Sequence, residues 1–298
     1  MPRHCRGASV RPAWGSGILL LLTAAALGAC SSTAASPTTS SSTPPVTTTT
    51  TFAPGPIGGP CAFKPSASTT GATGARSDKS VTRLGTGQVL ENANVKHLTI
   101  SGKNVTVRNV QVNGSILVTG DGATIDHVTA KGISISSASG TTVQFTNIGF
   151  GQGDGIHVTS DRGRQVRNVT LRYNYVHDPR VPDNAHYDGT QVRGINGLTI
   201  SCSVYDPGPY QHMYNAAVYL EDANGGDSNI TVTHNWLYGF GFSVMVDAAN
   251  VTLSANRIGG DIHWASCRLG KRTGNPNLRI TGNVEDSGGA VTKLCQAK

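Results

Sequence analysis

Charged and aromatic side chains are scarce in this sequence of 298 residues, at 14% and 6% of the total. Its 24 Lys and Arg residues outnumber 17 Asp and Glu, but they form none of the basic runs typical of a nucleic-acid surface. No apolar stretch is long enough to span a bilayer as a helix. Glycine is abundant, with 37 residues, and glycine weakens helix interiors. The composition therefore disfavours a helical bundle and a nucleic-acid partner, and it predicts a turn-rich β protein.

The N-terminal segment predicts export. Three arginines precede the apolar run 18–27, which is too short to cross a membrane but suits a secretory signal. The run ends in Leu27-Gly28-Ala29-Cys30, which resembles the bacterial lipobox, whose cysteine receives a diacylglyceryl group after cleavage. An ordinary cleavage site beside an incidental cysteine is the alternative. We predict a signal peptide over 1–29, lipidation of Cys30, and anchoring of the exported protein to the outer face of the cell membrane.

A polar linker follows the lipidation site. Residues 31–53 contain fifteen Ser or Thr, three Pro and no charged residue. Such a segment buries too little apolar surface to order itself. We therefore predict a disordered tether over 30–53 that holds the folded part away from the membrane.

From residue 95 onward the chain repeats one phrase, a polar–apolar alternation opened by Asn or Gly and followed by a second alternation containing Asn. Asn229-Ile-Thr-Val-Thr-His-Asn is one of eight copies. Their third residues stand at 106, 124, 142, 170, 199, 231, 252 and 279. Alternation predicts strands, and a regular return without amphipathic helices predicts stacked coils. We predict an all-β, single-stranded, right-handed parallel β-helix over 95–298 with an N-terminal cap over 54–94; a β-sandwich or propeller is the alternative.

Two short phrases carry a family resemblance. They read Val176-His177-Asp178 and His186-Tyr187-Asp188-Gly189-Thr190-Gln191. With them, residues 60–298 resemble the pectate-lyase-like superfamily of parallel β-helix proteins, in particular a bacterial branch with a His-x-Asp-Gly-x-Gln phrase. The resemblance implies the fold, but that fold serves lyases, hydrolases, epimerases and adhesins. The chain lacks the Asp-Asp pair of polygalacturonases and the Trp-Ile-Asp-His phrase of pectate lyases, so neither catalytic assignment can be inherited.

Aligning the second strand of each coil predicts which side chains point outward. Two columns should point inward: Ile156, Thr190, Val218, Val244 and Ile262, and beside them Val158, Val192, Leu220, Val246 and Trp264. Alternation then places two ladders on the surface, which we call the strip. These are His157, Gln191, Tyr219, Met245 and His263, and Thr159, Arg193, Glu221, Asp247 and Ala265. Coils lie about 4.8 Å apart, so Arg193, Glu221 and Asp247 should contact one another in turn.

The strip and the long loops beside it supply the candidate site residues. The catalytic candidates are Arg193, Glu221, Asp188, His186, His157 and Asp247. The candidates for substrate binding are Gln191, Tyr219, His177, Tyr205, Tyr210 and Tyr214. For Ca²⁺, which prefers six to eight oxygens, the candidate ligands are Asp178, Asp183 and Asp188; we expect no other cofactor.

Two reactions on a polysaccharide fit these residues. In a lyase, Arg193 would neutralise the sugar's acid group while His157, Tyr219 or His186 moves the proton. In a hydrolase, Glu221 and Asp247, or either with Asp188, would be the two carboxylates. Alternatively Arg193 and Glu221 form only a surface ion pair, Asp188-Gly189 only a turn, and the protein is a glycan-binding or structural lipoprotein. In each case we expect a monomer whose partner is a polysaccharide or cell-wall glycan.

Four cysteines remain after processing, an even set in an exported protein, which predicts two disulfides. Cys267 and Cys295 end similar segments 28 residues apart, the length of one coil, so we pair them. The pair Cys61 and Cys202 follows by exclusion, and it requires the cap segment to run along several coils.

Overall fold

The computed structural model describes residues 60–271 and 275–286. The predicted signal peptide, the lipidation site Cys30, the tether and Cys295 lie outside these described residues. The described part of the chain contains strands and no helix, and so no helix that is long and apolar enough to cross a membrane.

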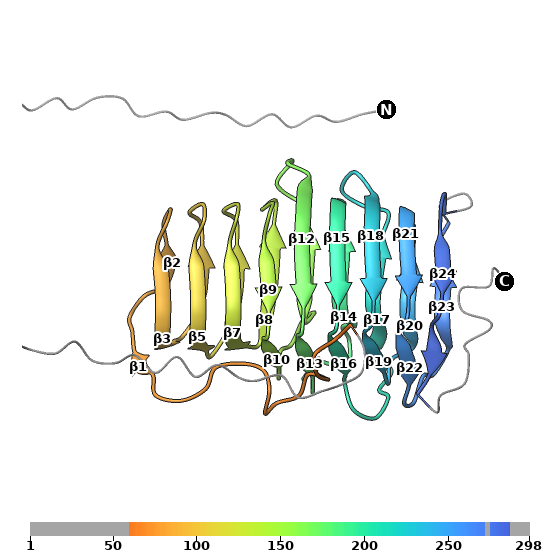
Figure 1. The fold of residues 1–298 in the computed structure, drawn as a ribbon, viewed down its shortest axis with the longest axis horizontal. Coiled ribbons are helices and arrows are strands. Elements are labelled where there is room, and N and C mark those ends of the chain that lie inside the picture. The colour runs from red at the N-terminus through yellow and green to blue at the C-terminus, as the bar shows by residue number, and fades with distance from the viewer. Residues whose placement is uncertain (1–59, 272–274, 287–298) are drawn as a thin grey trace, which may run out of the picture. The chain divides into compact units, whose positions relative to one another are not determined.

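The strands stack in parallel ladders and form a parallel β-helix, which confirms the predicted fold class (Figure 1). Nine strands form one sheet: β2 (Arg83–Leu84), β4 (Leu98–Ile100), β6 (Ser115–Val118), β8 (Gly132–Ser136), β11 (Ile156–Thr159), β14 (Tyr187–Arg193), β17 (Tyr214–Glu221), β20 (Phe242–Val246) and β23 (Ala265–Leu269). Sixteen form the other: β1 (Ser77–Asp78), β3 (Val89–Val95), β5 (Thr106–Val112), β7 (Thr124–Ala130), β9 (Thr142–Gln144), β10 (Asn147–Gly149), β12 (Val166–Arg172), β13 (Tyr175–His177), β15 (Ile195–Ser201), β16 (Val204–Asp206), β18 (Asp227–Thr233), β19 (Trp236–Tyr238), β21 (Ala248–Ser254), β22 (Arg257–Gly259), β24 (Arg279–Thr281) and β25 (Val284–Glu285). Consecutive turns of the chain thus contribute one strand to the nine-stranded sheet and one or two to the other.

The repeated phrase has a conformational cause. Its opening residue adopts a left-handed backbone, with φ of 53° at Asn104, 92° at Gly197 and 55° at Asn250. Glycine and asparagine take this conformation at the least cost. The second Asn of the phrase is buried and links the coils, because Asn256 Oδ1 accepts a hydrogen bond of 3.0 Å from the backbone N of Asn235.

The inward columns of the nine-stranded sheet are confirmed over four coils. Strand pairing places Ile156 beside Thr190, and Val218 beside Val244. All the predicted inward residues from β11 to β20 are buried. These side chains form the core between the two sheets, so the outward positions of the same strands are fixed as well.

The predicted register is wrong in the last coil. β20 pairs with β23, and Val244 lies beside Cys267 rather than Ile262. The segment 261–264 belongs to the connection before β23, and Trp264, expected inside, is 50% exposed. The extra residues of this coil enter that connection, so Arg268 follows Met245 in the ladder where we had placed His263.

The segment before the coils runs along the sixteen-stranded sheet, and we call residues 60–76 the strap. A disulfide joins Cys61 to Cys202, with 5.6 Å between their Cα atoms, which confirms that predicted pair. Further along, Gly71 N donates a 2.8 Å hydrogen bond to Phe145 O, and Arg76 Nε donates one of 3.1 Å to Asn94 Oδ1. The strap therefore crosses several coils, as the disulfide requires.

Two boundaries near the ends of the described chain bear on the predictions. Strand pairing begins at β1, where Ser77 lies beside Ala93, and the nine-stranded sheet begins at Arg83; both starts lie within the segment 54–94 that we expected to form a cap. At the other end Cys267 is disulfide-bonded. Its predicted partner Cys295 lies outside the described residues, so that pairing stays a prediction.

Candidate functional site

Two aspartates stand at the same position in consecutive coils. β11 and β14 pair Ile156 with Thr190, so Asp154 and Asp188 are register neighbours two residues earlier. The backbone N of Asp188 donates a 2.9 Å hydrogen bond to Asp154 Oδ1. Asp188 is fully buried; its Oδ1 accepts hydrogen bonds from Asn215 Nδ2 and the backbone N of Ala216, while its Oδ2 has no hydrogen bond. We call Asp154 and Asp188 the carboxyl pair.

The environment of the carboxyl pair favours a bound proton. Burial raises the pKa of Asp188 well above its usual range, and the adjacent Asp154 carboxylate raises it further. Burial also raises the pKa of Asp154, although the hydrogen bond from Asp188 N and the nearby histidines oppose that shift. Two carboxyl groups this close do not ionise independently. The pair therefore retains a proton at a pH where a solvated carboxyl has lost its own.

Two histidines lie beside the carboxyl pair. His186 Nε2 is 3.8 Å from Asp188 Oδ2, and its side chain is 64% exposed. His157 Nδ1 is 3.8 Å from Asp154 Oδ2, and burial lowers the pKa of this imidazole. An exposed imidazole and a half-buried one with a lowered pKa thus flank two carboxyl groups with raised pKa values, which is a set of groups suited to proton transfer.

Among the described residues, the carboxyl pair and His186 form the group that could hold a metal ion. Asp154, His186 and Asp188 each offer one ligand atom, and these atoms lie within 4.8 Å of one another. Two carboxylates and an imidazole suit a transition-metal ion better than Ca²⁺. Of the Ca²⁺ ligands predicted from the sequence, only Asp188 belongs to this group; Asp178 contacts His177 Nδ1 at 2.7 Å.

Close packing, rather than a turn of the chain, explains the glycine in the Asp-Gly phrase. Gly189 lies inside β14. A Cβ added there would lie 2.5 Å from Tyr205 Cδ1 and 2.7 Å from the carbonyl oxygen of Ala217, so a larger residue would collide with the next coil. Gly155, after Asp154, is equally crowded, with Gly189 O 2.6 Å from such an atom. The turn proposed from the sequence is therefore wrong for Asp188-Gly189.

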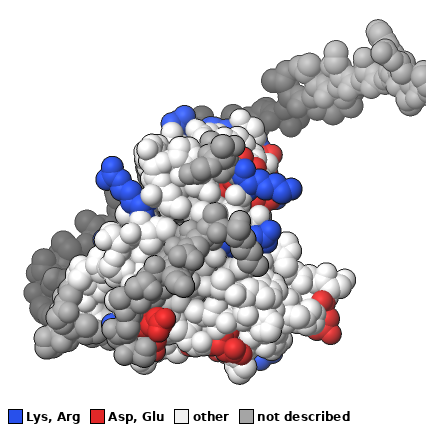
Figure 2. Space-filling view, turned by 90° about the vertical axis from the view of Figure 1, so that its right-hand side faces the viewer, with Lys and Arg blue, Asp and Glu red and all other residues white. Residues whose placement is uncertain are grey.

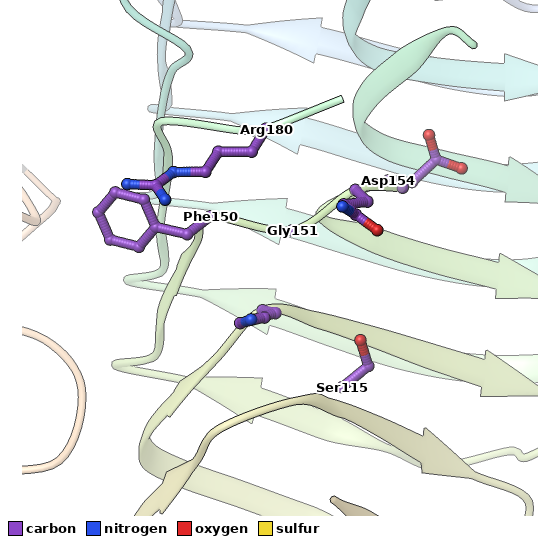
Figure 3. Close-up of a pocket in the computed structure, with 8 residues that line it drawn as sticks. Ser115, Phe150, Gly151, Asp154 and Arg180 are labelled. Atoms are coloured by element: carbon purple, nitrogen blue, oxygen red, sulfur yellow. The ribbon is translucent and has the colours of Figure 1, made fainter. Parts of the chain in front are cut away.

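Asp154 of the carboxyl pair lines a depression of about 730 Å³, and the buried Asp188 is not part of its lining. Asp154 lies on one side of it, and Arg180 with Phe150 lies on the other (Figure 3). Lys131 also lines the depression and occupies the register position of Asp154 in the preceding coil. Asp154, Lys131 and Phe150 are not among the candidates predicted from the sequence; for Asp154 the available signal was the Asp-Gly repeated at 154 and 188.

Arg193 and Glu221 lie at the far end of their strands. They are adjacent, as the alignment predicted, with Arg193 Nε 3.0 Å from Glu221 Oε2, though Nε makes no hydrogen bond. Gln191 Nε2 donates to the same Glu221 oxygen at 3.2 Å, and Gln191 is buried rather than exposed. Five residues separate Asp188 from Arg193 along β14, roughly 16 Å at strand rise. The strip thus has two parts, with His157 between them.

Asp247 does not join the carboxyl pair. It lines a separate depression of about 200 Å³ with Tyr219 and Arg268, and its carboxylate packs against Gly270. Tyr219 is half-buried. Glu221 and Asp247 therefore belong to a different part of the surface from Asp154.

Three predicted substrate-binding residues are in the wrong place for that role. Tyr205 and Tyr214 are buried, and Tyr205 OH lies 2.9 Å from Thr190 Oγ1 in the core. His177 is buried on the other sheet, with both ring nitrogens in hydrogen bonds, to Asp178 and Asn147. His177 and Tyr205 lie in three-residue strands, β13 and β16, which the loop sequences concealed, and Tyr214 begins β17. Tyr210 remains partly exposed and stacks on His263, with ring centres 4.0 Å apart.

Charge is sparse on the end of the β-helix nearest β23 and β24. In Figure 2 the basic and acidic side chains of the described residues on that face are scattered among uncharged ones. That face therefore presents separate charges rather than a continuous field of one sign.

No protein-family model matches the chain, and no curated protein matches it. Its strand arrangement is similar to that of three solved structures. An alginate lyase from Paenibacillus sp. str. FPU-7 is 15% identical over 66% of this chain and 77% of its own, with a TM-score of 0.48. The catalytic unit of a GH87 α-1,3-glucanase from Streptomyces thermodiastaticus is 13% identical over 69% of this chain and 50% of its own, with a TM-score of 0.41. A tailspike protein of E. coli bacteriophage HK620 is 12% identical over 74% of this chain and 60% of its own, with a TM-score of 0.25. At these values the likeness concerns the strand arrangement alone.

Proposed function

We propose that the β-helix binds a polysaccharide and cleaves its glycosidic bonds at the carboxyl pair. The observation that carries this proposal is the pair itself: Asp154 lines an open depression, and Asp188, fully buried behind it, has a raised pKa. A carboxyl group that keeps its proton near neutral pH can donate it to a glycosidic oxygen as the bond breaks.

The roles follow from accessibility. Asp154 reaches the depression and donates the proton to the leaving oxygen. Asp188 cannot touch a sugar, so it positions Asp154, whose Oδ1 accepts the hydrogen bond from Asp188 N. His186 is exposed beside the pair and accepts a proton, either from water in hydrolysis or from a sugar carbon in elimination. Because Asp188 is inaccessible, the pair is not the nucleophile-and-acid arrangement of a retaining glycosidase.

The test uses the soluble domain and a panel of plant, algal and bacterial polysaccharides. Reducing ends and ultraviolet-absorbing unsaturated ends are followed together. Unsaturated products identify elimination, and reducing ends alone identify hydrolysis. Asp154→Asn should remove either activity while leaving the thermal midpoint close to that of the wild type. Binding of a polymer without either product would contradict the proposal and favour a glycan-binding module.

We also propose that the protein is exported and anchored by lipid on Cys30. The disulfide Cys61–Cys202 supports export, because disulfides persist in oxidising compartments. The tether then places the site on the outside of the cell, where polysaccharides are met.

A further inference from the structure

The depression beside Asp154 is lined by two exposed cationic side chains. Lys131 and Arg180 both line it with exposed side chains, and neither forms an ion pair with another described residue. Asp154 is the acidic residue of the lining, and its side chain is only 12% exposed. The exposed charges of the lining are therefore the two cations. We call this place the Lys131–Arg180 pocket.

Phe150 gives the pocket an aromatic wall. Its ring is 46% exposed, and the Arg180 guanidinium carbon lies 5.0 Å from the ring centre (Figure 3). The backbone fixes this arrangement, because Arg180 N donates a 2.7 Å hydrogen bond to Gly151 O. Phe150 itself has a φ of 61°, a costly conformation for a bulky residue. The ring is thus held exposed at the surface, where a sugar face can stack on it.

The third component, Lys131, comes from a neighbouring coil. It lies between β7 and β8, while Phe150 follows β10 and Arg180 follows β13. Gly151 makes this convergence possible, because a Cβ there would lie 2.1 Å from the carbonyl oxygen of Lys131. Three successive coils therefore bring two cations and one aromatic ring to a single pocket next to the carboxyl pair.

We propose that the Lys131–Arg180 pocket binds the anionic group of a sugar, so that the substrate is an acidic polysaccharide. The Arg180 guanidinium matches a carboxylate or sulfate with two parallel hydrogen bonds, and Lys131 adds a point charge. Phe150 supports the sugar ring. The inference rests on the proposed function in one respect only: it places this charged sugar next to the glycosidic bond whose oxygen receives a proton from Asp154.

The experiment measures binding and cleavage separately, with full-length processed protein. The probes are alginate and polygalacturonate, the same two polymers after reduction of their carboxyl groups, and dextran sulfate with dextran as its neutral counterpart. The test variant is Lys131→Gln/Arg180→Gln. The matched control, Arg162→Gln/Arg167→Gln, removes the same charge from exposed positions outside the pocket.

We expect the wild type to bind at least one charged polymer tightly and to lose this binding on the neutral counterpart of that polymer. The test variant should bind that polymer roughly tenfold or more weakly, with an affinity that depends less on salt, because screened charge pairs are removed. The control should match the wild type. Preference for carboxylated over sulfated polymers identifies the anion as a uronate, and the reverse identifies a sulfate ester.

Other results separate this inference from the proposed function. If the charged polymer is bound through the pocket but not cut, the substrate class stands and the cleavage proposal fails. If a neutral polymer is bound or cut as well as its charged counterpart, or the test variant equals the control, the anionic subsite is overturned while cleavage can stand. Failure to bind any charged probe also overturns it.

Discussion

Proton affinity at the carboxyl pair sets the expected pH dependence of catalysis. A general acid must be protonated, and burial raises the pKa of Asp154, so kcat/KM should fall as pH rises through that raised value. Asp154→Asn should lower kcat/KM by roughly 10² to 10⁴-fold, the usual contribution of such a group. A pH–rate profile on whichever polymer is cleaved measures both.

Asp188→Asn and Glu221→Gln provide the comparison. Asparagine retains the oxygen that accepts from Asn215 and Ala216, so Asp188→Asn should fold, lose part of the rate, and move the basic limb of the profile. Glu221→Gln, at the far end of the strip, should change the rate less than Asp154→Asn. A Glu221→Gln variant as inactive as Asp154→Asn, with a wild-type profile for Asp188→Asn, would transfer catalysis to the Arg193–Glu221 part of the strip.

Asp227 gives a pH-dependent stability that is separate from catalysis. It is buried, its Oδ1 accepts hydrogen bonds from the backbone N of Gly194 and Ile195, and burial raises its pKa to about 7. The unfolded chain loses this proton near pH 4, so between about pH 4 and 7 the folded state binds more protons. Stability contributed by Asp227 is therefore full below pH 4 and is lost as pH rises towards 7.

Denaturant midpoints from pH 4 to 8 test this expectation. Asp227→Asn removes the titrating group. Between about pH 4 and 7 the free energy of unfolding of this variant should therefore fall by a few kcal/mol less than that of the wild type. Asp78→Asn, at an exposed acid of β1, is the control and should keep the wild-type slope. Parallel curves for the wild type and Asp227→Asn would show that Asp227 is ionised in the folded state throughout.

At the scale of strands and coils, periodicity explains how much of the fold is predictable. The left-handed backbone at the start of each phrase requires Asn or Gly, so each coil can be recognised in the sequence by this residue. The predicted register is wrong in the last coil because the segment 261–264 has the composition of a strand but lies in a connection. Connection length is not fixed by the coil, so alternation alone could not locate β23.

The candidate site was less predictable than the fold for a related reason. Outward positions within β14 and β17 follow from alternation, and Arg193 beside Glu221 was found that way. The Lys131–Arg180 pocket combines residues from turns of three coils, whose side-chain directions no strand period determines. Tyr205 was misplaced likewise, because its loop context concealed an inward position.

The disulfide links the strap covalently to the coils, so it should add to the stability that the strap's hydrogen bonds and ring contacts provide. It closes a separation of 141 residues. A loop of this size predicts about 5 kcal/mol in the chain-entropy model, an upper value for such crosslinks. Cys61→Ser/Cys202→Ser should therefore lower the unfolding free energy by several kcal/mol, measured by denaturant titration.

Paired substitution is preferable to a reductant, because Cys267 is also disulfide-bonded and would be reduced as well. Limited proteolysis should then cut the strap near residues 60–76 before the coils are cleaved. Equal stability and an uncut strap in the variant would mean that contacts such as Arg76 with Asn94 hold the strap without the crosslink.

For the whole molecule, the order of segments from Cys30 to the β-helix suggests how the site is presented to polysaccharides. In the proposed lipoprotein, Cys30 would carry the lipid, and the predicted tether over 30–53 would separate the folded domain from the membrane. In this arrangement the domain needs no apolar surface of its own to remain at the cell envelope. Fractionation of cells that produce the full-length chain tests the anchor directly.

Cys30→Ser should move the protein out of the membrane fraction, into either the soluble fraction or an uncleaved precursor of higher mass, because the acyl chains supply the affinity for the bilayer. Ser31→Ala, which leaves the cysteine in place, is the matched control and should fractionate as the wild type does. Labelling with a radioactive fatty acid should mark the wild type and this control but not Cys30→Ser. Unchanged membrane association of Cys30→Ser, without label on the wild type, would show that this cysteine is incidental and that the segment before it is an ordinary signal or anchor.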